Sequence, residues 1–383
     1  MKKKEKHKAK VFVVITARPS YARVKTVLQE LQRIKQIELL IVLAGSAVLR
    51  EYGDISEVLT SDGLNVAYRV HCMIDGNEIS NMPKSTALLT SEISTLISNA
   101  SPDLVVTIAD RFETLATSIA ASFQHIPLVH IQGGESSGSI DDKVRNANTM
   151  LADYHFPATS RAESRLVQMG IKEGSIFNLG CPSVDLIRAA MEAPLDVEVI
   201  FDKYTGVGKR PSLSKPYVMV MQHSVTSEAE DARQQIRETL KAVADSNIPA
   251  IWFWPNIDQG SDDISSEIRR FRERAPNHKI FFIKNMSPED FLQVLLRSAC
   301  LIGNSSVGIR ECAFSGLPCV NGGSRQNNRE RAENVLDVAC QSESILEAIK
   351  LQISKSTYDS STLYGDGYAG AKIAKRLALL CLN

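Results

Sequence analysis

The chain has 383 residues, of which 44% are hydrophobic and 23% are charged, with 44 basic and 44 acidic side chains. This length predicts two domains, and the composition is that of a folded globular protein, which excludes a disordered chain. The balanced charge gives no net field that would hold nucleic acid or an anionic membrane. No apolar run approaches the roughly 20 residues of a membrane span. We therefore expect a cytoplasmic protein without nucleic-acid or membrane partners.

In the first half of the chain, short apolar runs alternate with longer amphipathic stretches. The runs that are typical of strands cover residues 10–16, 38–44, 103–109 and 127–131. The stretches with apolar residues at helical spacing cover residues 21–34, 86–99 and 113–123. Strands separated by helices indicate βαβ units and therefore a parallel sheet.

The same alternation restarts after a polar segment that contains proline and glycine, at 192–216. Strand-like runs then cover residues 217–221, 250–254, 279–283, 300–303 and 318–321. Helical stretches cover residues 228–245, 288–298 and 369–380. We predict an α/β fold with two Rossmann-like domains, at 10–190 and 215–365, and a C-terminal helix within 366–383 that can pack back on the N-terminal domain.

The cysteines are scattered along the chain and include no Cys-x-x-Cys pair. This distribution indicates reduced residues in a cytosolic protein, and it predicts neither a disulfide framework nor a zinc site. The seven residues are Cys72, Cys181, Cys300, Cys312, Cys319, Cys340 and Cys381.

Polar clusters follow several predicted strands, at the edge where open parallel sheets bind ligands. Arg18 follows the first strand and can pair with a phosphate; alternatively, it is a surface arginine beside a helix that Pro19 starts. Asp110 and Arg111 follow the strand at 103–109, and adjacent opposite charges there are costly unless they face a cleft or are paired. Asp110 can act as a base, hold a sugar hydroxyl, or simply cap the next helix.

The richest polar cluster begins at the end of the fourth predicted strand, where two adjacent glycines allow the backbone to pass close to a ligand. Together with His130, the residues Glu135, Asp141 and Arg145 supply proton-transfer groups and a positive charge within one short segment, as general acid–base chemistry requires. Ser139 and Asp142 also fit a helix capping box. Capping accounts for those two residues but not for Glu135.

The second half of the chain carries a different set of polar residues at its strand ends. His223 follows the first strand there and is either a ligand-facing donor or a structural residue. Ser305 and Ser306 open a helix whose free amides can cradle a diphosphate, and Glu311 in that helix can accept hydrogen bonds from a ribose diol. Arg325 can face a base or a phosphate. Alternatively, the serines form a simple N-cap without a ligand, and Arg325 lies in an ordinary surface loop.

Taken together, the clusters resemble the hydrolysing UDP-N-acetylglucosamine 2-epimerases over almost the whole chain, from about residue 11 to 377. Many separated motifs in one order make this resemblance specific, which no single motif would. The motifs are Ala-Asp-Arg-Phe-Glu (109–113), His-Ile-Gln-Gly-Gly-Glu (130–135), Gly-Ser-Ile-Asp-Asp (138–142), Gly-Cys-Pro-Ser (180–183), Pro-Asn-Ile-Asp (255–258), Ile-Gly-Asn-Ser-Ser (302–306), Arg-Gln (325–326) and Tyr-Gly-Asp-Gly (364–367).

The resemblance implies a GT-B architecture with the active site in the interdomain cleft. It also implies a reaction in which UDP leaves C1 of the sugar as a proton leaves C2, giving a 2-acetamidoglucal. Water then adds to give N-acetylmannosamine or a related sugar. This chemistry needs no redox cofactor and no metal, and the resemblance implies a homodimer or homotetramer.

The residues that match the family's motifs divide into two groups. Those matching the catalytic group are Asp110, Glu135, Asp141 and Arg145. Those matching the substrate and nucleotide site are Arg18, Arg111, His223, Ser305, Ser306, Glu311 and Arg325. Which carboxylate removes the C2 proton stays open at the level of sequence.

The chain departs from the family pattern at three positions. Asn146 stands where the family usually has histidine, Met150 where it has lysine, and Ser20 where an acidic residue is common. Asn146 cannot exchange a proton. The change is compatible with a different sugar, such as a 2,4-diacetamido-trideoxyhexose, with altered hydration, or with a UDP-sugar-binding homologue that has lost catalysis. The motifs are also compatible with a non-hydrolysing epimerase or with a glycosyltransferase on the same architecture.

Overall fold

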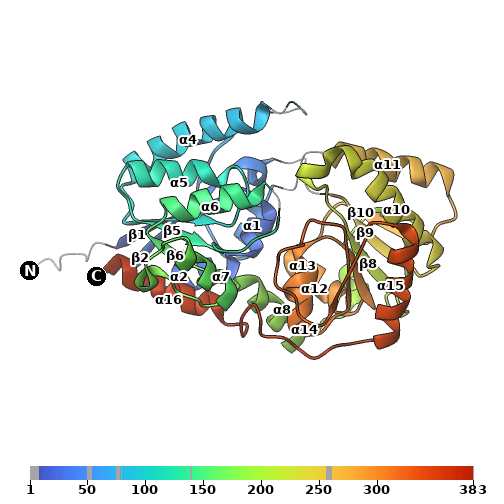
Figure 1. The fold of residues 1–383 in the computed structure, drawn as a ribbon. Coiled ribbons are helices and arrows are strands. Elements are labelled where there is room, and N and C mark those ends of the chain that lie inside the picture. The colour runs from blue at the N-terminus through green and yellow to red at the C-terminus, as the bar shows by residue number, and fades with distance from the viewer. Residues whose placement is uncertain are drawn as a thin grey trace, which may run out of the picture. The chain divides into compact units, whose positions relative to one another are not determined.

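The structure is a computed structural model that describes residues 8–49, 54–74, 78, 80–138, 140–255 and 261–382. The chain forms two compact units (Figure 1). The first unit contains the residues up to Ser136, Asp141–Asp185 and the segment from Gly365 onward. The second contains Leu186–Tyr364, together with the short segment between Ser136 and Asp141.

The first unit is built on a six-stranded parallel sheet with the order β3-β2-β1-β4-β5-β6. The chain winds outward from β1 in one direction and from β4 in the other, so the winding reverses between these two strands. Loops diverge at such a switch point and leave room for a ligand. The strands are β1 (Ala9–Ile15), β2 (Ile37–Leu43), β3 (Val66–Arg69), β4 (Leu104–Ile108), β5 (Leu128–Ile131) and β6 (Tyr154–Phe156).

Helices cover both faces of this sheet, which is why its central strands are continuous apolar runs. Val13 of β1 belongs to the core beneath α2 and α16, whereas the next residue, Val14, belongs to the core beneath α4 and α5 (Figure 1). The helices of the unit are α1 (Arg18–Ala22), α2 (Lys25–Arg33), α3 (Ser56–Ser61), α4 (Asn81–Ala100), α5 (Thr114–Phe123), α6 (Asp141–Leu151), α7 (Ser160–Gln168) and α16 (Ala369–Leu382).

The C-terminal helix α16 packs on α2 and is capped by a residue that is distant in sequence. The buried carboxylate of Asp185 accepts hydrogen bonds from the backbone N–H groups of Ala369 and Gly370, at 2.8 and 2.6 Å. It also accepts one from the hydroxyl of Thr26 on α2, at 2.9 Å. Free N–H groups at a helix start favour such an anionic partner. Asp185 therefore joins α16 to α2.

The second unit has a seven-stranded sheet with the order β13-β12-β11-β8-β9-β10-β7. All neighbours are parallel except β7, which pairs with β10 in the antiparallel sense. The winding reverses between β8 and β11, so this unit has a switch point equivalent to that of the first. The strands are β7 (Gly206–Gly208), β8 (Val218–Met221), β9 (Ala250–Phe253), β10 (Ile280–Ile283), β11 (Cys300–Gly303), β12 (Cys319–Gly322) and β13 (Val335–Val338).

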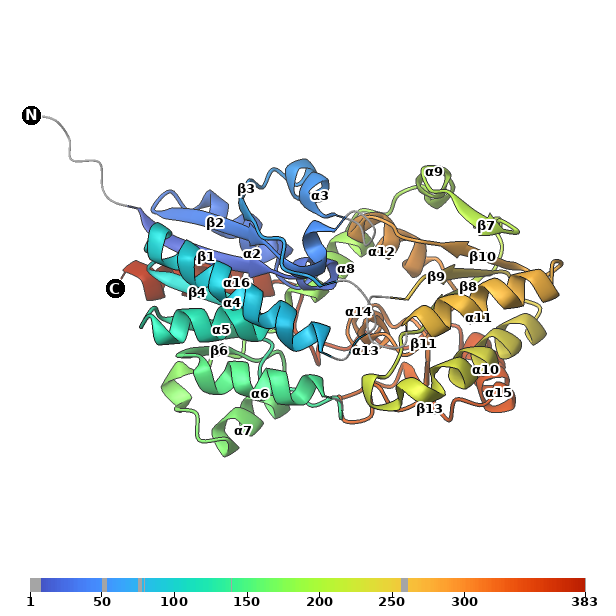
Figure 2. The ribbon, with the colours of Figure 1, turned by 90° about the horizontal axis from the view of Figure 1, so that it is seen from above.

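Helices again lie on both faces of the second sheet (Figure 2). Trp252 and Phe282 pack with α10, α11 and α15 on one face, and Phe253 packs edge-on against Phe291 of α12 on the other. The helices are α8 (Pro182–Glu192), which spans the boundary of the units, α9 (Val197–Asp202), α10 (Ala232–Asp245), α11 (Ser261–Arg274), α12 (Pro288–Leu296), α13 (Ser306–Ile309), α14 (Glu311–Ser315) and α15 (Ser342–Lys355).

The structure differs from the sequence prediction in a few elements. The single helix expected at 21–34 is two helices, α1 and α2, because the backbone leaves the helical conformation at Val24. None of the four edge strands of the two sheets, β3, β6, β7 and β13, is among the predicted elements. In β3, half-buried and exposed residues alternate, and β7 is exposed throughout. Within the described part of the chain, the structure contains no helix that is both long enough and apolar enough to span a membrane.

Candidate active site

Two loops meet at the switch point of the first unit, one after β1 and one after β4. Arg18 is the first residue of α1 and is half-buried, and Asp110 lies two residues beyond β4 and is buried. The guanidinium of Arg23, at the end of α1, lies 3.7 Å from the carboxylate of Asp110. This ion pair joins the two loops. Arg23 is not among the residues predicted for the site, because nothing in its local sequence indicates a partner so distant along the chain.

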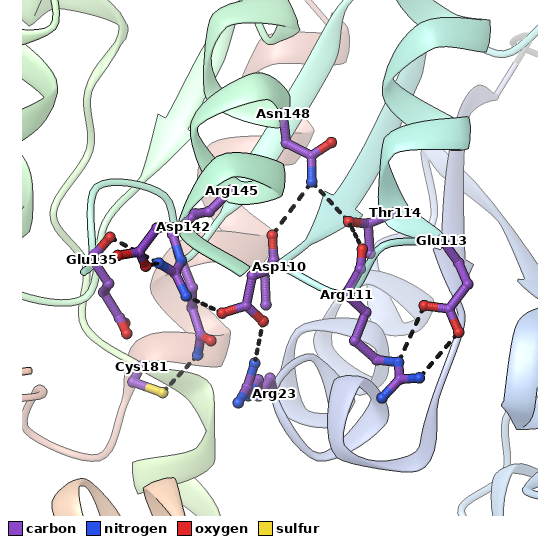
Figure 3. Close-up of polar contacts among 12 residues, drawn as sticks. Arg23, Asp110, Arg111, Glu113, Thr114, Glu135, Asp142, Arg145, Asn148 and Cys181 are labelled. Carbon is purple, nitrogen blue, oxygen red and sulfur yellow. Dashed lines mark hydrogen bonds and ion pairs between the residues drawn. The ribbon is translucent and has the colours of Figure 1, made fainter. Parts of the chain in front are cut away.

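A buried arginine gathers the acidic residues of this unit (Figure 3). Arg145, on α6, is only 1% exposed, and it forms ion pairs with Asp110 and Asp142. It also donates a hydrogen bond to the backbone carbonyl of Glu135, at 2.9 Å. The fork of a guanidinium allows several acceptors to be held at once. Arg145 therefore fixes the end of β4, the glycine-containing loop and the start of α6 in one arrangement.

The electrostatics of this cluster keep Arg145 charged. Burial alone would lower the pKa of its guanidinium, but the negative charges of Asp110, Glu135 and Asp142 outweigh burial and raise that pKa above its ordinary value. A buried cation among carboxylates is costly unless such partners surround it. The arrangement holds two of the expected acids, Asp110 and Glu135, in a defined and largely dehydrated place.

The other residues predicted for this segment are Asp141, Asp142 and Ser139. Asp141 is the first residue of α6 and is half-buried, and the carboxylate that pairs with Arg145 at this helix end belongs to its neighbour Asp142. Asp142 also accepts a hydrogen bond from the hydroxyl of Ser136, at 2.9 Å. Ser139, expected as part of a capping box, lies outside the described residues.

Arg111 makes contacts within its own loop. Its guanidinium donates to both carboxylate oxygens of Glu113, each at 3.2 Å, and the Glu113 side chain is completely buried (Figure 3). Glu113 is not among the predicted site residues, although it ends the Ala-Asp-Arg-Phe-Glu motif. This pair fixes the direction of the Arg111 side chain, since a buried carboxylate retains its cation strongly.

Asn146, which stands where the family usually has histidine, lies on α6 and is half-buried. Among the described residues, its side-chain oxygen is buried without a hydrogen-bond partner. Met150, one turn further along the same helix, is 61% exposed. Of these two departures from the family pattern, Asn146 therefore buries an unsatisfied polar atom, whereas Met150 faces solvent.

In the second unit, a buried asparagine joins the two loops of the switch point. The side chain of Asn304, after β11, accepts from the backbone N–H of His223 and donates to its carbonyl, both at 2.8 Å. Gly303, with a φ of +129°, allows this approach, because a Cβ there would lie 2.0 Å from the carbonyl oxygen of Met221. Asn304 belongs to the Ile-Gly-Asn-Ser-Ser motif but is not among the predicted site residues.

Several predicted nucleotide-site residues converge around this asparagine. Ser305 is the N-cap of α13 and accepts from the N–H of Val307 at 3.4 Å, so Ser306 begins the helix. Arg325 and Gln326 both donate to the carbonyl of Asn304, at 3.2 and 2.9 Å.

Glu311 is placed differently from its expected position inside the serine-capped helix. It begins α14, because the serine-capped helix α13 ends at Ile309 and Arg310 separates the two helices. Its side chain is half-buried. As for metals, the described residues include no group of three or more histidine, cysteine or acidic side chains that could hold an ion.

Two doubly wound parallel-sheet units, each with polar side chains at its switch point, define the GT-B class of α/β proteins, as predicted from the sequence. A family model described as UDP-N-acetylglucosamine 2-epimerase matches residues 29–378. The chain belongs to this family, as its motifs indicated.

Related sequences agree with this family assignment, and a solved structure agrees with the fold. The chain is 31% identical to a UDP-N,N'-diacetylbacillosamine 2-epimerase (hydrolyzing) of Legionella pneumophila, over 98% of this chain and 97% of that one. It is 27% identical to a UDP-N-acetylglucosamine 2-epimerase of Neisseria meningitidis, over 94% and 91%. The fold is similar to that of the Methanocaldococcus jannaschii UDP-GlcNAc 2-epimerase in complex with UDP-GlcNAc and UDP, with a TM-score of 0.81, 18% identity and coverage of 97% and 99%.

Proposed function

We propose that this protein is a hydrolysing 2-epimerase that converts a UDP-activated 2-acetamido sugar to UDP and the free 2-epimer. The observation that carries the proposal is the buried cluster of Asp110, Glu135 and Arg145 at the switch point of the first unit. Its membership of the epimerase family supports the same conclusion.

The reaction has two halves with opposite proton movements. In the first, a carboxylate removes the proton from C2, the C1–O bond breaks, and its electron pair leaves with UDP, so that a C1=C2 double bond remains. In the second, water adds its hydroxyl to C1, and a proton reaches C2 from the opposite face. The C2 proton is weakly acidic, so the step needs a positioned base and stabilisation of the departing diphosphate.

We assign the proton transfers to the acids of the first unit. Asp110, Glu135 and Asp141 are the candidate acids and bases, and Arg145 fixes Asp110 and the backbone of Glu135 in place. Asp110→Asn, Glu135→Gln and Asp141→Asn are each expected to lower turnover by about 100-fold or more, in the range of general acid–base catalysis. UDP affinity should change little, and full activity in all three variants would remove the proposed acid–base centre.

We assign UDP binding to the switch point of the second unit. The support is the cluster of polar groups around Asn304, where the N-terminus of α13 and the guanidinium of Arg325 offer donors to a diphosphate. The residues proposed to contact the nucleotide or sugar are Arg18, Arg111, His223, Ser305, Ser306, Glu311 and Arg325. The double variant Ser305→Ala and Ser306→Ala should weaken UDP binding in calorimetry, and unchanged affinity would discard this part of the proposal.

Among UDP-activated 2-acetamido sugars, we place UDP-N,N'-diacetylbacillosamine first. The relative named for that substrate is 31% identical to this chain, against 27% for the UDP-N-acetylglucosamine epimerase of Neisseria meningitidis. Asn146, where the family usually has histidine, is compatible with a changed sugar site. An Asn146→His variant that gains activity on UDP-N-acetylglucosamine would support a role of this position in choosing the sugar.

Product analysis distinguishes a hydrolysing epimerase from a non-hydrolysing one and from a binding protein. Each UDP-sugar is incubated with the purified protein, and the products are separated by anion-exchange chromatography. Free sugar together with UDP supports a hydrolysing epimerase, and an epimerised sugar still joined to UDP indicates a non-hydrolysing one. Thermal stabilisation by UDP without turnover indicates a binding protein. Light scattering on the same sample tests the expected homodimer or homotetramer.

A further inference from the structure

The residue before Asp110 has an unusual backbone conformation. Ala109 has a φ of +63°, in the left-handed region that residues other than glycine rarely adopt. Its N–H continues the sheet by donating to the carbonyl of Ile131, at 2.9 Å. Such a conformation persists only where the surroundings hold it, and it sets the direction in which the next side chain leaves the backbone.

A completely buried histidine holds the carbonyl of Ala109. His130, on β5, places Nε2 at 2.9 Å from that oxygen and Nδ1 at 3.0 Å from the hydroxyl of Thr149 on α6. Because a carbonyl only accepts, Nε2 carries the proton, and Nδ1 accepts from Thr149. Burial lowers the pKa of His130 to about 4, so the ring stays neutral near pH 7 and keeps this tautomer.

An asparagine and a threonine hold the other side of the same turn (Figure 3). Asn148, on α6, donates to the hydroxyl of Thr114 at 2.7 Å and lies 3.5 Å from the carbonyl of Ala109. Thr114 in turn donates to the carbonyl of Arg111, at 2.6 Å. The oxygen of the Asn148 side chain accepts from the hydroxyl of Ser118, at 2.8 Å. The carbonyls immediately before and after Asp110 are therefore both held by buried, uncharged side chains.

We propose that His130, Asn148 and Thr114 are positioning residues that hold Ala109 in its left-handed conformation and so direct the carboxylate of Asp110 toward the sugar. The effect on catalysis rests on the proposed function. The claim that these three residues hold Ala109 in its left-handed conformation does not depend on it. The carboxylate of Asp110 is held from its side-chain end by Arg145 and from its backbone end by these three residues. A misplacement of about 1 Å at a reacting group can cost on the order of 100-fold in rate.

The chain offers a matched control for testing His130. His155, on β6, is the register partner of His130, is equally buried, and also has a pKa lowered to about 4 by burial. Among the described residues, its Nδ1 has no hydrogen-bond partner. His130→Phe removes the bond to Ala109, whereas His155→Phe changes a similar environment without touching that turn.

The expected result is a difference between these two variants. His130→Phe should lower kcat by about 100-fold with KM and UDP affinity nearly unchanged, and crystal structures should show that Ala109 has left the left-handed region. His155→Phe should retain both kcat and the φ of Ala109. An unchanged Ala109 in His130→Phe, or equal losses of kcat in the two variants, would overturn the proposal. If the wild-type protein releases no UDP, the proposed function fails, and the conformation of Ala109 still decides the geometric part.

Thr114 provides a second, conservative pair of variants. Thr114→Val keeps the shape of the side chain but cannot donate to the carbonyl of Arg111, whereas Thr114→Ser keeps the hydroxyl. We expect kcat to fall by about 10-fold or more in the valine variant and to stay within about twofold of wild type in the serine variant. Equal activity of the two variants would contradict the role of the hydroxyl.

Discussion

Arg145 and Asp110 form an ion pair between α6 and the carboxyl end of β4, and the arginine side chain is almost completely buried. A second carboxylate, that of Asp142, shares the same guanidinium. Removing the cation would leave two acidic groups close together with little water around them. The stability of the first unit and the order of its acids therefore depend on the same side chain.

The first prediction concerns the removal of this cation. Arg145→Met should lower the free energy of unfolding by roughly 3–5 kcal/mol, the usual cost of breaking a buried ion pair on one side. Arg145→Lys retains a charge but cannot reach Asp110, Asp142 and the carbonyl of Glu135 together, so its loss should be smaller. Urea unfolding followed by circular dichroism measures both. A methionine variant as stable as the wild type would show that the ion pairs of Arg145 contribute nothing to the free energy of unfolding.

The second prediction concerns Asn304 and its two bonds to the backbone of His223. Asn304→Leu should weaken UDP binding by about 10-fold or more, because the loops of the switch point lose the side chain that joins them. Asn321, on the neighbouring strand β12, is equally buried and bonds to Asp337 at 2.6 Å. The Asn321→Leu control should bind UDP nearly as the wild type does. Calorimetric titration that finds the same affinity in both variants would argue against the assignment.

The third prediction concerns the cap of the C-terminal helix. Asp185→Ala removes an acceptor for two backbone N–H groups of α16 and for the hydroxyl of Thr26, and it should cost about 2 kcal/mol. Asp196 caps the short helix α9 on the protein surface, through the N–H groups of Glu198 and Val199. Asp196→Ala should cost only about 1 kcal/mol or less. Chemical denaturation measures both losses. A larger loss of stability in Asp196→Ala than in Asp185→Ala would contradict the importance of the long-range cap.

The fourth prediction concerns the dependence of stability on pH. Burial lowers the pKa of both His130 and His155 to about 4, below the ordinary value of 6.5. Between these values, the histidines bind protons in the unfolded chain but not in the folded chain. Their contribution to the free energy of unfolding is therefore fully present above pH 6.5 and is lost as the pH decreases toward 4. Each histidine contributes a slope of up to about 1.4 kcal/mol per pH unit. Denaturation between pH 4.5 and 7.5 should therefore give a smaller slope for His155→Phe than for the wild type, and an unchanged slope would refute this origin.

The strands that position the site could be predicted because they are buried on both faces and read as unbroken apolar runs. The runs at 10–16 and 103–109 correspond to β1 and β4, and the run at 300–303 coincides with β11. The edge strand β3 could not be predicted, because its alternation of half-buried and exposed residues is short and equally typical of a loop.

Some residues of the site could likewise be predicted from the sequence, and others could not. Asp110, Glu135 and Ser305 follow strands and could be selected because strand ends are where open sheets present ligands. Arg23 and Asn148 could not be selected, since their roles come from partners that are distant in sequence and adjacent only after folding. The role of His130 depends on the left-handed backbone of Ala109, which local sequence does not reveal for a residue other than glycine.

The central claim is that the protein breaks the bond to UDP while exchanging the proton at C2. Proton NMR of the protein with UDP-N,N'-diacetylbacillosamine in heavy water, alongside UDP-N-acetylglucosamine, follows cleavage, stereochemistry and exchange in one experiment. We predict free UDP and a free 2-epimer that carries deuterium at C2. Release of a sugar that retains its original C2 proton, or a sugar nucleotide that stays joined to UDP, would contradict the account.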